Sequence, residues 1–239
     1  MTDARPSRRR LHVLLCIQSV IVVLLSVNRL SSATTGFVAS NEFLRWVDLD
    51  NLVLALATLI AAYLLIQHLA YDSPRRDGVA HRALGLTFFF GAMLYALSYG
   101  EHEVTNYLHG RFCIDAGGAS GNRLCEIIAY HDDQFSHYVF FAGFTIISVA
   151  IMLTQVLFPD DRPSTVADTV LIAFNALFIA AGIIANLGFE EIGLDLYVVA
   201  AVAVLAVILL IRQPRQLILR YYAIAYVIGL CGAGAAQLT

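Results

Sequence analysis

The sequence contains no lysine, and all fifteen of its basic residues are arginine. A retinal chromophore needs a lysine amine for its Schiff base, so the chain is not a retinal protein. Charge of either sign is scarce: charged residues make up 14% of the chain, against about a quarter in a typical soluble domain. The net charge of −3 and the lack of a continuous basic stripe exclude nucleic acid as a partner.

What the chain has in abundance is apolar sequence, because 59% of its residues are hydrophobic and its mean hydropathy is +0.73. A helix needs about 20 apolar residues to cross a bilayer. Seven stretches qualify or nearly qualify, at residues 11–30, 49–70, 83–102, 133–158, 165–187, 194–211 and 217–238. We therefore predict an all-α polytopic membrane protein, a single domain over 1–239 with seven transmembrane helices. We expect the outer loop 103–132 to cover a polar site.

The arginines predict the orientation, since basic residues near helix ends are retained in the cytoplasm. With the N-terminus inside, eleven arginines fall on the inner side and four on the outer side. This bias predicts a cytoplasmic N-terminus and a C-terminus outside, in a bacterial inner membrane whose outer face is periplasmic. The first apolar run, which follows Arg8, Arg9 and Arg10, also has the outline of a signal peptide, and its removal would leave the later topology unchanged.

The chain has four cysteines, and two of them bracket one polar loop. Cys113 and Cys125 fall on the outer side in this topology, where an oxidising compartment favours disulfides, so we predict that they are bonded. Cys16 and Cys231 lie inside apolar runs and are expected to behave as small hydrophobic residues.

Ionisable residues are concentrated in two short segments, at 98–109 and 131–137. Residues three, four or seven apart share a helix face, and one such polar stripe runs through Tyr95, Ser98, His102, Asn106 and His109. Asp133 and His137 are four apart and are expected to meet on the next span. Ionisable groups are costly beside hydrocarbon, so the two segments indicate a functional site.

The two segments are expected to lie at the same depth in the membrane. The third predicted span ends outward where the fourth begins, so His102 and His137 are expected to approach each other just under the outer interface. Other acids at the same level could surround the same pocket: Asp48, Asp50, Glu190, Glu191 and Asp195. By contrast, His68 and His81 fall near the inner boundary, where we expect no catalytic role.

Imidazoles with carboxylates are the ligands of a divalent ion such as zinc, whose bound water can act as a nucleophile. The predicted metal ligands are His102, His137, His131 and Asp133. The predicted catalytic residues are Asp133 and Glu101, which would orient a histidine or accept a proton, and Ser98, which would donate to an oxyanion. The predicted activity is hydrolysis of a lipid-like ester or amide that enters from the membrane.

Two short motifs bear on this hypothesis. His102 to Asn106 is a near match to the H-E-x-x-H zinc helix, with asparagine in place of the second histidine. Ser98 and His102, four apart, resemble part of the site of the seven-helix membrane hydrolases of the alkaline ceramidase and adiponectin-receptor type, with Asp133 in place of their aspartate. The late H-x-x-x-H pair of those hydrolases has no counterpart, because no histidine follows His137.

Other functions fit the same residues. Intramembrane histidines and acids also mark ion or proton conduction and solute transport, although a through route needs polar residues at several depths. His102 and His137 could instead be axial ligands of a haem. Finally, the cluster could be a hydrogen-bonded cap of a non-catalytic accessory protein, with His131, Asp132 and Glu126 facing water and His109 in a structural role.

Overall fold

The computed structural model describes residues 7–71, 78–114, 122–188 and 193–238. Over these residues, seven helical segments are long and apolar enough to cross a membrane, as the hydropathy predicted. The helices are α1 (Arg8–Leu30), α2 (Trp46–Leu69), α3 (Val79–Leu108), α4 (Arg123–Tyr130), α5 (Ser136–Leu157), α6 (Val166–Leu187), α7 (Leu194–Arg212) and α8 (Leu217–Ala236), with a short 3₁₀ turn at Ser32–Thr34. Two π-helical segments, η3 (His109–Ile114) and η4 (His131–Phe135), complete the chain.

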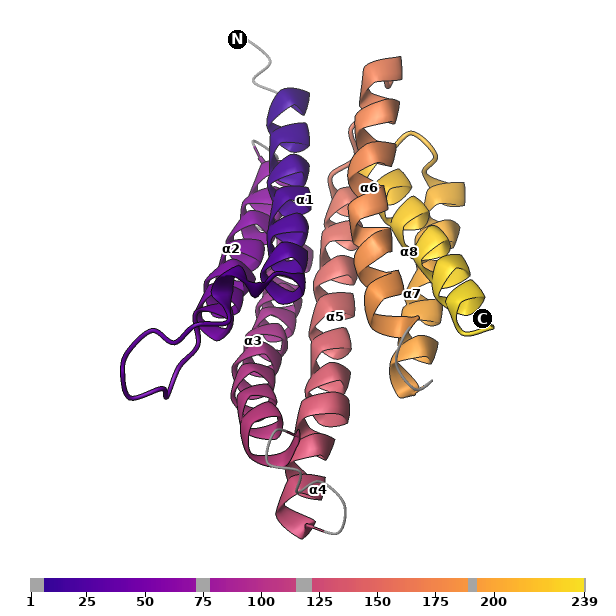
Figure 1. Cartoon of the computed structure of the whole chain (residues 1–239). Coiled ribbons are helices and arrows are strands. Elements are labelled where there is room, and N and C mark those ends of the chain that lie inside the picture. Colours follow the sequence, from indigo (N-terminus) through magenta and orange to yellow (C-terminus); the bar gives the residue numbers. More distant parts are fainter. Residues whose placement is uncertain (1–6, 72–77, 115–121, 189–192, 239) are drawn as a thin grey trace.

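The third and fourth spans are longer than the sequence predicted, because α3 continues into η3 and α5 is preceded without a break by α4 and η4. The continuous segment Val79–Ile114 has 36 residues and Arg123–Leu157 has 35, about 54 Å at 1.5 Å per residue. That length exceeds the roughly 30 Å hydrocarbon core, so the α3–α4–α5 hairpin projects beyond the other helices (Figure 1). The expected outer loop 103–132 is therefore helical over most of its length, and its residues 115–121 lie outside the described part.

The predicted disulfide between Cys113 and Cys125 is present at the tip of this hairpin. It joins η3 to α4, with the two Cα atoms 5.6 Å apart. Cys16 and Cys231 are free thiols. The disulfide fixes the end of the projecting hairpin, and thus the spacing of the two helical segments that carry the ionisable residues.

Helices α3 and α5 are in backbone contact at two glycines. A Cβ atom on Gly143 would lie 2.5 Å from the backbone nitrogen of Tyr95 and 2.8 Å from the carbonyl oxygen of Gly91. Gly229 and Gly232 on α8 likewise lie close to α6, where an added Cβ would meet the side chains of Ile183 and Ile184. The close α3–α5 crossing brings the polar ends of both helices to one level.

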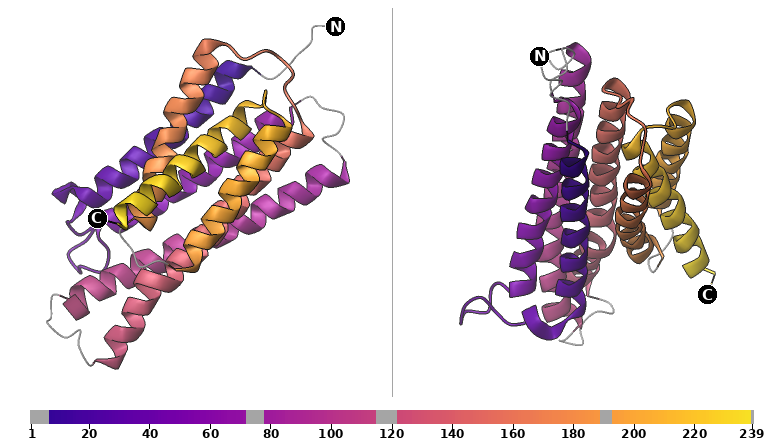
Figure 2. Two further views of the ribbon diagram at one scale, coloured as in Figure 1. Left: turned by 90° about the vertical axis from the view of Figure 1, so that its right-hand side faces the viewer. Right: turned by 90° about the horizontal axis from the view of Figure 1, so that it is seen from above.

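Helices α1 and α6 run parallel and are joined by two polar pairs. Nε2 of His12 lies 2.8 Å from Oδ1 of Asp168, and the hydroxyl of Ser19 donates to Oδ1 of Asn175 at 2.7 Å. Each pair joins residues that are 156 positions apart in the sequence. A step of seven residues along both helices therefore leads from one pair to the next. This ladder holds α1 on α6 over the half of the bundle near the N-terminus (Figure 2).

Candidate functional site

One buried carboxylate, Asp132, is the centre of the ionisable cluster. The residue is 1% exposed, and each of its two oxygens faces an imidazole from the end of α3. Oδ1 lies 2.9 Å from Nδ1 of His102, and Oδ2 accepts a hydrogen bond from Nδ1 of His109 at 3.0 Å. Asn106 approaches Oδ2 at 3.5 Å. The sequence hypothesis that put Asp132 in water is therefore wrong.

The contact between His102 and Asp132 is close but not aligned. Nδ1 of His102 and Oδ1 of Asp132 are both buried, and neither has a partner that meets hydrogen-bond geometry. Two ligand atoms of one zinc ion lie about 3.4 Å apart, because bonds of about 2.1 Å meet at the tetrahedral angle. The two atoms would therefore need to move slightly apart to share an ion.

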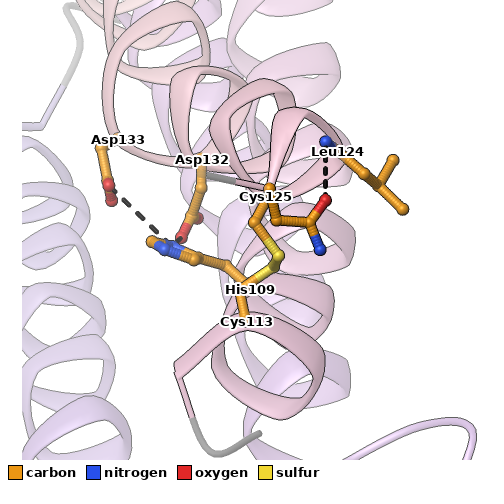
Figure 3. Close-up of a disulfide and its surroundings, with 7 residues drawn as sticks. His109, Cys113, Leu124, Cys125, Asp132 and Asp133 are labelled. Carbon is orange, nitrogen blue, oxygen red and sulfur yellow. Dashed lines mark hydrogen bonds and ion pairs between the residues drawn. A yellow bond between two sulfur atoms is a disulfide. The ribbon is translucent and has the colours of Figure 1, made fainter. Parts of the chain in front are cut away.

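A second group of potential ligand atoms surrounds the other oxygen of Asp132. Atoms of His109, Asp132 and Asp133 lie within 4.8 Å of one another, and Figure 3 shows the two carboxylates directed at the imidazole. Oδ2 of Asp133 is 3.9 Å from Nδ1 of His109, and the Asp133 side chain is 63% exposed. These three residues form an open-sided candidate metal site.

The π-helical turn η4 explains why Asp132 and not Asp133 occupies the centre. In an α-helix, Asp133 would lie one turn from His137 on the same face. A π-helical turn takes one more residue, so over His131–Phe135 the inward position passes to Asp132. The π turn is held by the hydroxyl of Ser136, which donates to the carbonyl oxygen of Asp132 at 2.6 Å. Asp133 is turned to the exposed edge.

The two histidines that the sequence placed together do meet. The rings of His102 and His137 have their centroids 5.2 Å apart in an edge-to-face arrangement. They come from α3 and η4–α5, whose glycine crossing fixes their common level. Whether His102 and His137 bind a metal stays a prediction.

The remaining predicted residues have partners of their own. Nδ1 of His131 lies 2.6 Å from Oε1 of Glu101 in a partly exposed pair beside the cluster. The hydroxyl of Ser98 is buried and donates to the carbonyl oxygen of Ser136 at 2.8 Å, which occupies its proton. Their predicted roles as ligand, base and oxyanion donor stay predictions.

Those of the more distant acids that the structure describes do not line the cavity beside the histidines. Asp48 forms an ion pair with Arg45 at 2.7 Å and lines a separate pocket between α2 and α3. Asp195 is buried at the start of α7, where it accepts from the backbone nitrogen of Leu196. Glu190 and Glu191 lie outside the described residues.

A cavity of about 340 Å³ adjoins the cluster. Its lining comes from α1, α2, α3, α5 and α6 and is mostly apolar, with Phe140, Phe144 and Ile179 among its walls. His102 and His137 also line it. His102 therefore contacts the buried carboxylate and also borders an apolar space of a size typical for a ligand.

The structure also contains a buried polar group that the sequence did not indicate. Glu103 is 5% exposed, accepts a hydrogen bond from Nδ2 of Asn51 at 3.0 Å, and lies 3.6 Å from a guanidinium nitrogen of Arg29. Asn51 in turn accepts from Asn28 at 2.8 Å. This network joins α1, α2 and α3 next to the cavity.

No family model matches the chain, and no curated protein or solved structure is significantly similar to it. Its function is therefore inferred from the geometry of this site.

Proposed function

We propose that this integral membrane protein binds a divalent metal ion, zinc being the best suited, at Asp132 and hydrolyses a lipid-like ester or amide. The ion's ligands would be Asp132, His109 and Asp133, with His102 on the other side of the same carboxylate. The observation that carries the proposal is that this buried carboxylate lies between two imidazoles, one of which borders an apolar cavity.

Charge favours an ion at this position. A buried carboxylate is costly unless it is paired, and its partners here are imidazoles rather than arginines. A divalent cation held by Asp132, His109 and Asp133 would offset the charge of Asp132. Imidazole nitrogen and carboxylate oxygen are both zinc ligands.

The cavity supports a lipid-like substrate. It lies between membrane-spanning helices, and its walls would accept an acyl chain. When bound, the ion would lower the pKa of a ligand water to about 7. His102 and His137 are near enough to each other to bind the reacting group and exchange a proton with it.

The side of the membrane is part of the proposal. The excess of arginine at the opposite end and the disulfide at the tip of the hairpin both support an extracytoplasmic site. Glu101 and His131 are left out of the proposed metal site because they already pair with each other.

The experiment is metal analysis of detergent-purified protein together with hydrolysis of a panel of ester- and amide-linked lipids. Asp132→Asn keeps the shape of the side chain and removes its charge, so it should reduce bound zinc at least tenfold and abolish hydrolysis. His109→Gln removes a proposed ligand and should weaken zinc binding by more than the roughly 10- to 100-fold that follows loss of a ligand's hydrogen-bond partner. His131→Gln is the matched control, since it removes a neighbouring imidazole outside the proposed ion site.

Two results would contradict the proposal. Zinc content that is unchanged in Asp132→Asn would show that the carboxylate is not a ligand. Folded protein that binds zinc but hydrolyses none of the lipids would refute the hydrolase assignment and leave the metal site.

Proton transfer is a second candidate function, favoured by the polar ladder between α1 and α6. His12 with Asp168 and Ser19 with Asn175 bring polar groups to two further depths. Proton flux into liposomes containing the protein would support this function if Asp168→Asn abolished the flux. An equal leak in protein-free liposomes would exclude it.

A further inference from the structure

The two polar pairs that join α1 and α6 end at the level where the cavity begins. One further step of seven residues leads from Ser19 and Asn175 to Ser26 and Gly182, and both of these line the cavity. A Cβ atom added to Gly182 would meet nothing within 4 Å. The two helices have therefore separated at this level, and the left view of Figure 2 shows α1 (indigo) and α6 (orange) diverging away from the N-terminus.

Arg29 lies at the end of α1 that borders this opening. It lines the cavity together with His102 and His137, and its side chain is 43% exposed. Its ion pair with Glu103, at 3.6 Å, is longer than a hydrogen bond, and Glu103 already accepts one from Asn51. The guanidinium therefore keeps N–H donors for a second anion at the cavity mouth.

We infer that the opening between α1 and α6 admits an acyl-chain lipid with an anionic headgroup, and that Arg29 binds that headgroup. The positive charge of Arg29 complements a phosphate or a carboxylate, which a guanidinium can bind through two parallel hydrogen bonds. The apolar walls at Phe140, Phe144 and Ile179 complement the chain. A water-soluble anion would leave these walls uncovered.

This inference names the substrate class of the proposed hydrolase. It rests on the proposed function only in assuming that the bound lipid is then hydrolysed. Binding of the lipid itself needs no metal ion. Arg29 would fix the headgroup end of the molecule at the level where His102 and His137 lie, which puts the bonds next to the headgroup beside the imidazoles. Arg29 is thus a positioning and specificity residue.

The test is lipid binding by the purified full chain, measured by native mass spectrometry in a neutral detergent with a chelator present. The probes are phosphatidylglycerol, oleate and phosphatidylcholine. We expect the anionic probes to bind at least tenfold more tightly than phosphatidylcholine, and the response to the first two distinguishes a phosphate from a carboxylate headgroup.

Arg29→Gln should remove that preference, and Arg29→Lys should retain part of it. Arg123→Gln, which changes an arginine on α4 that is 86% exposed, is the matched control and should bind like the unaltered chain. Gly182→Trp should fill the opening and reduce binding of all three probes, and its elution as a single folded species separates blockage from misfolding.

An unchanged preference for anionic lipid in Arg29→Gln overturns the inference, as does full binding in folded Gly182→Trp. Asp132→Asn separates the two proposals because it removes the proposed metal site and leaves Arg29 in place. If the unaltered chain binds no zinc and hydrolyses no lipid, yet prefers anionic lipid through Arg29, the proposed function fails and the lipid site stands.

Discussion

Nδ1 of His102 lies 2.9 Å from Oδ1 of Asp132, although the two residues belong to different helical segments of the projecting hairpin. This contact makes two adjacent acids unequal. The Asp132 side chain is 2% exposed and has imidazoles on both sides, whereas that of Asp133 is 63% exposed. This difference in burial arises from one π-helical turn, and replacing each acid by alanine measures its effect on stability.

Asp132→Ala should destabilise the protein by about 3 kcal/mol, because His109 and Asn106 lose their buried acceptor and His102 loses the carboxylate beside it. Asp133→Ala, one residue away and exposed, should change stability by less than about 0.5 kcal/mol. Unfolding in mixed micelles, with a chelator present, measures both. Equal effects at the two positions would contradict the burial assigned to Asp132.

Gly143→Ala should destabilise the α3–α5 pair by several kcal/mol. The added Cβ meets backbone atoms of Tyr95 and Gly91, so the helices must move apart. Gly85→Ala is the control on α3, where the added Cβ meets nothing within 4 Å, and it should be neutral or slightly stabilising. The measurement is the thermal midpoint in detergent. Similar midpoints for the two variants would argue against the close crossing.

Replacing both Cys113 and Cys125 by serine should destabilise the hairpin by about 3 kcal/mol in the chain-entropy description of a short cross-linked loop. A reductant should lower the thermal midpoint of the unaltered chain and leave the double variant unaffected. Cys231→Ser, at an exposed free thiol, is the control. A midpoint insensitive to reductant in the unaltered chain would show that the bond contributes no stability.

Asp160, in the turn before α6, should make stability depend on acid. Burial by itself would raise its pKa, but hydrogen bonds from Arg162 and the charge of Arg8 hold the pKa below the ordinary 3.8. The folded state therefore favours the ionised carboxylate of Asp160. The contribution of this carboxylate to stability is complete above pH 3.8 and is lost as the pH falls towards its pKa in the folded state.

Asp160→Asn should therefore cost about 1 kcal/mol near pH 7 and progressively less below pH 3.8. Thermal midpoints of the variant and the unaltered chain, compared between pH 7 and pH 3, give this difference. Asp161→Asn, at the exposed neighbouring acid, should show no such trend. A cost that grew on acidification would mean that the pKa is raised instead.

The sequence was sufficient for the features that depend on composition and local spacing. Seven apolar runs predicted seven spans, and the position of Cys113 and Cys125 in one loop predicted their disulfide. The contact of His102 with His137 was predicted because the third span ends, and the fourth begins, at the same depth in the membrane. The orientation of the chain in the membrane stays a prediction.

Two features, one of helical register and one of contact between segments far apart in the sequence, were not predicted. The assignment of Asp133 to the inward face assumed an α-helical period, and the π turn at His131–Phe135 changed it. The pairing of His12 with Asp168 joins segments 156 residues apart. The sequence held one sign of this pairing: Ser19 follows His12 by seven residues, and Asn175 follows Asp168 by seven. That match indicates a contact only once α1 and α6 are known to be parallel.

The contact between Gly91 and Gly143 holds α3 and α5 closely together. Backbone against backbone leaves α3 and α5 no clearance for sliding or tilting. Helix α6 is itself packed closely on α8 at Gly229 and Gly232, so any widening for a bulky ligand would come mainly from α1, which pivots at the Ser19–Asn175 hydrogen bond. His102 and His137 lie on α3 and α5, whereas the opening lies between α1 and α6, so movement at the opening leaves the spacing of the two imidazoles unchanged.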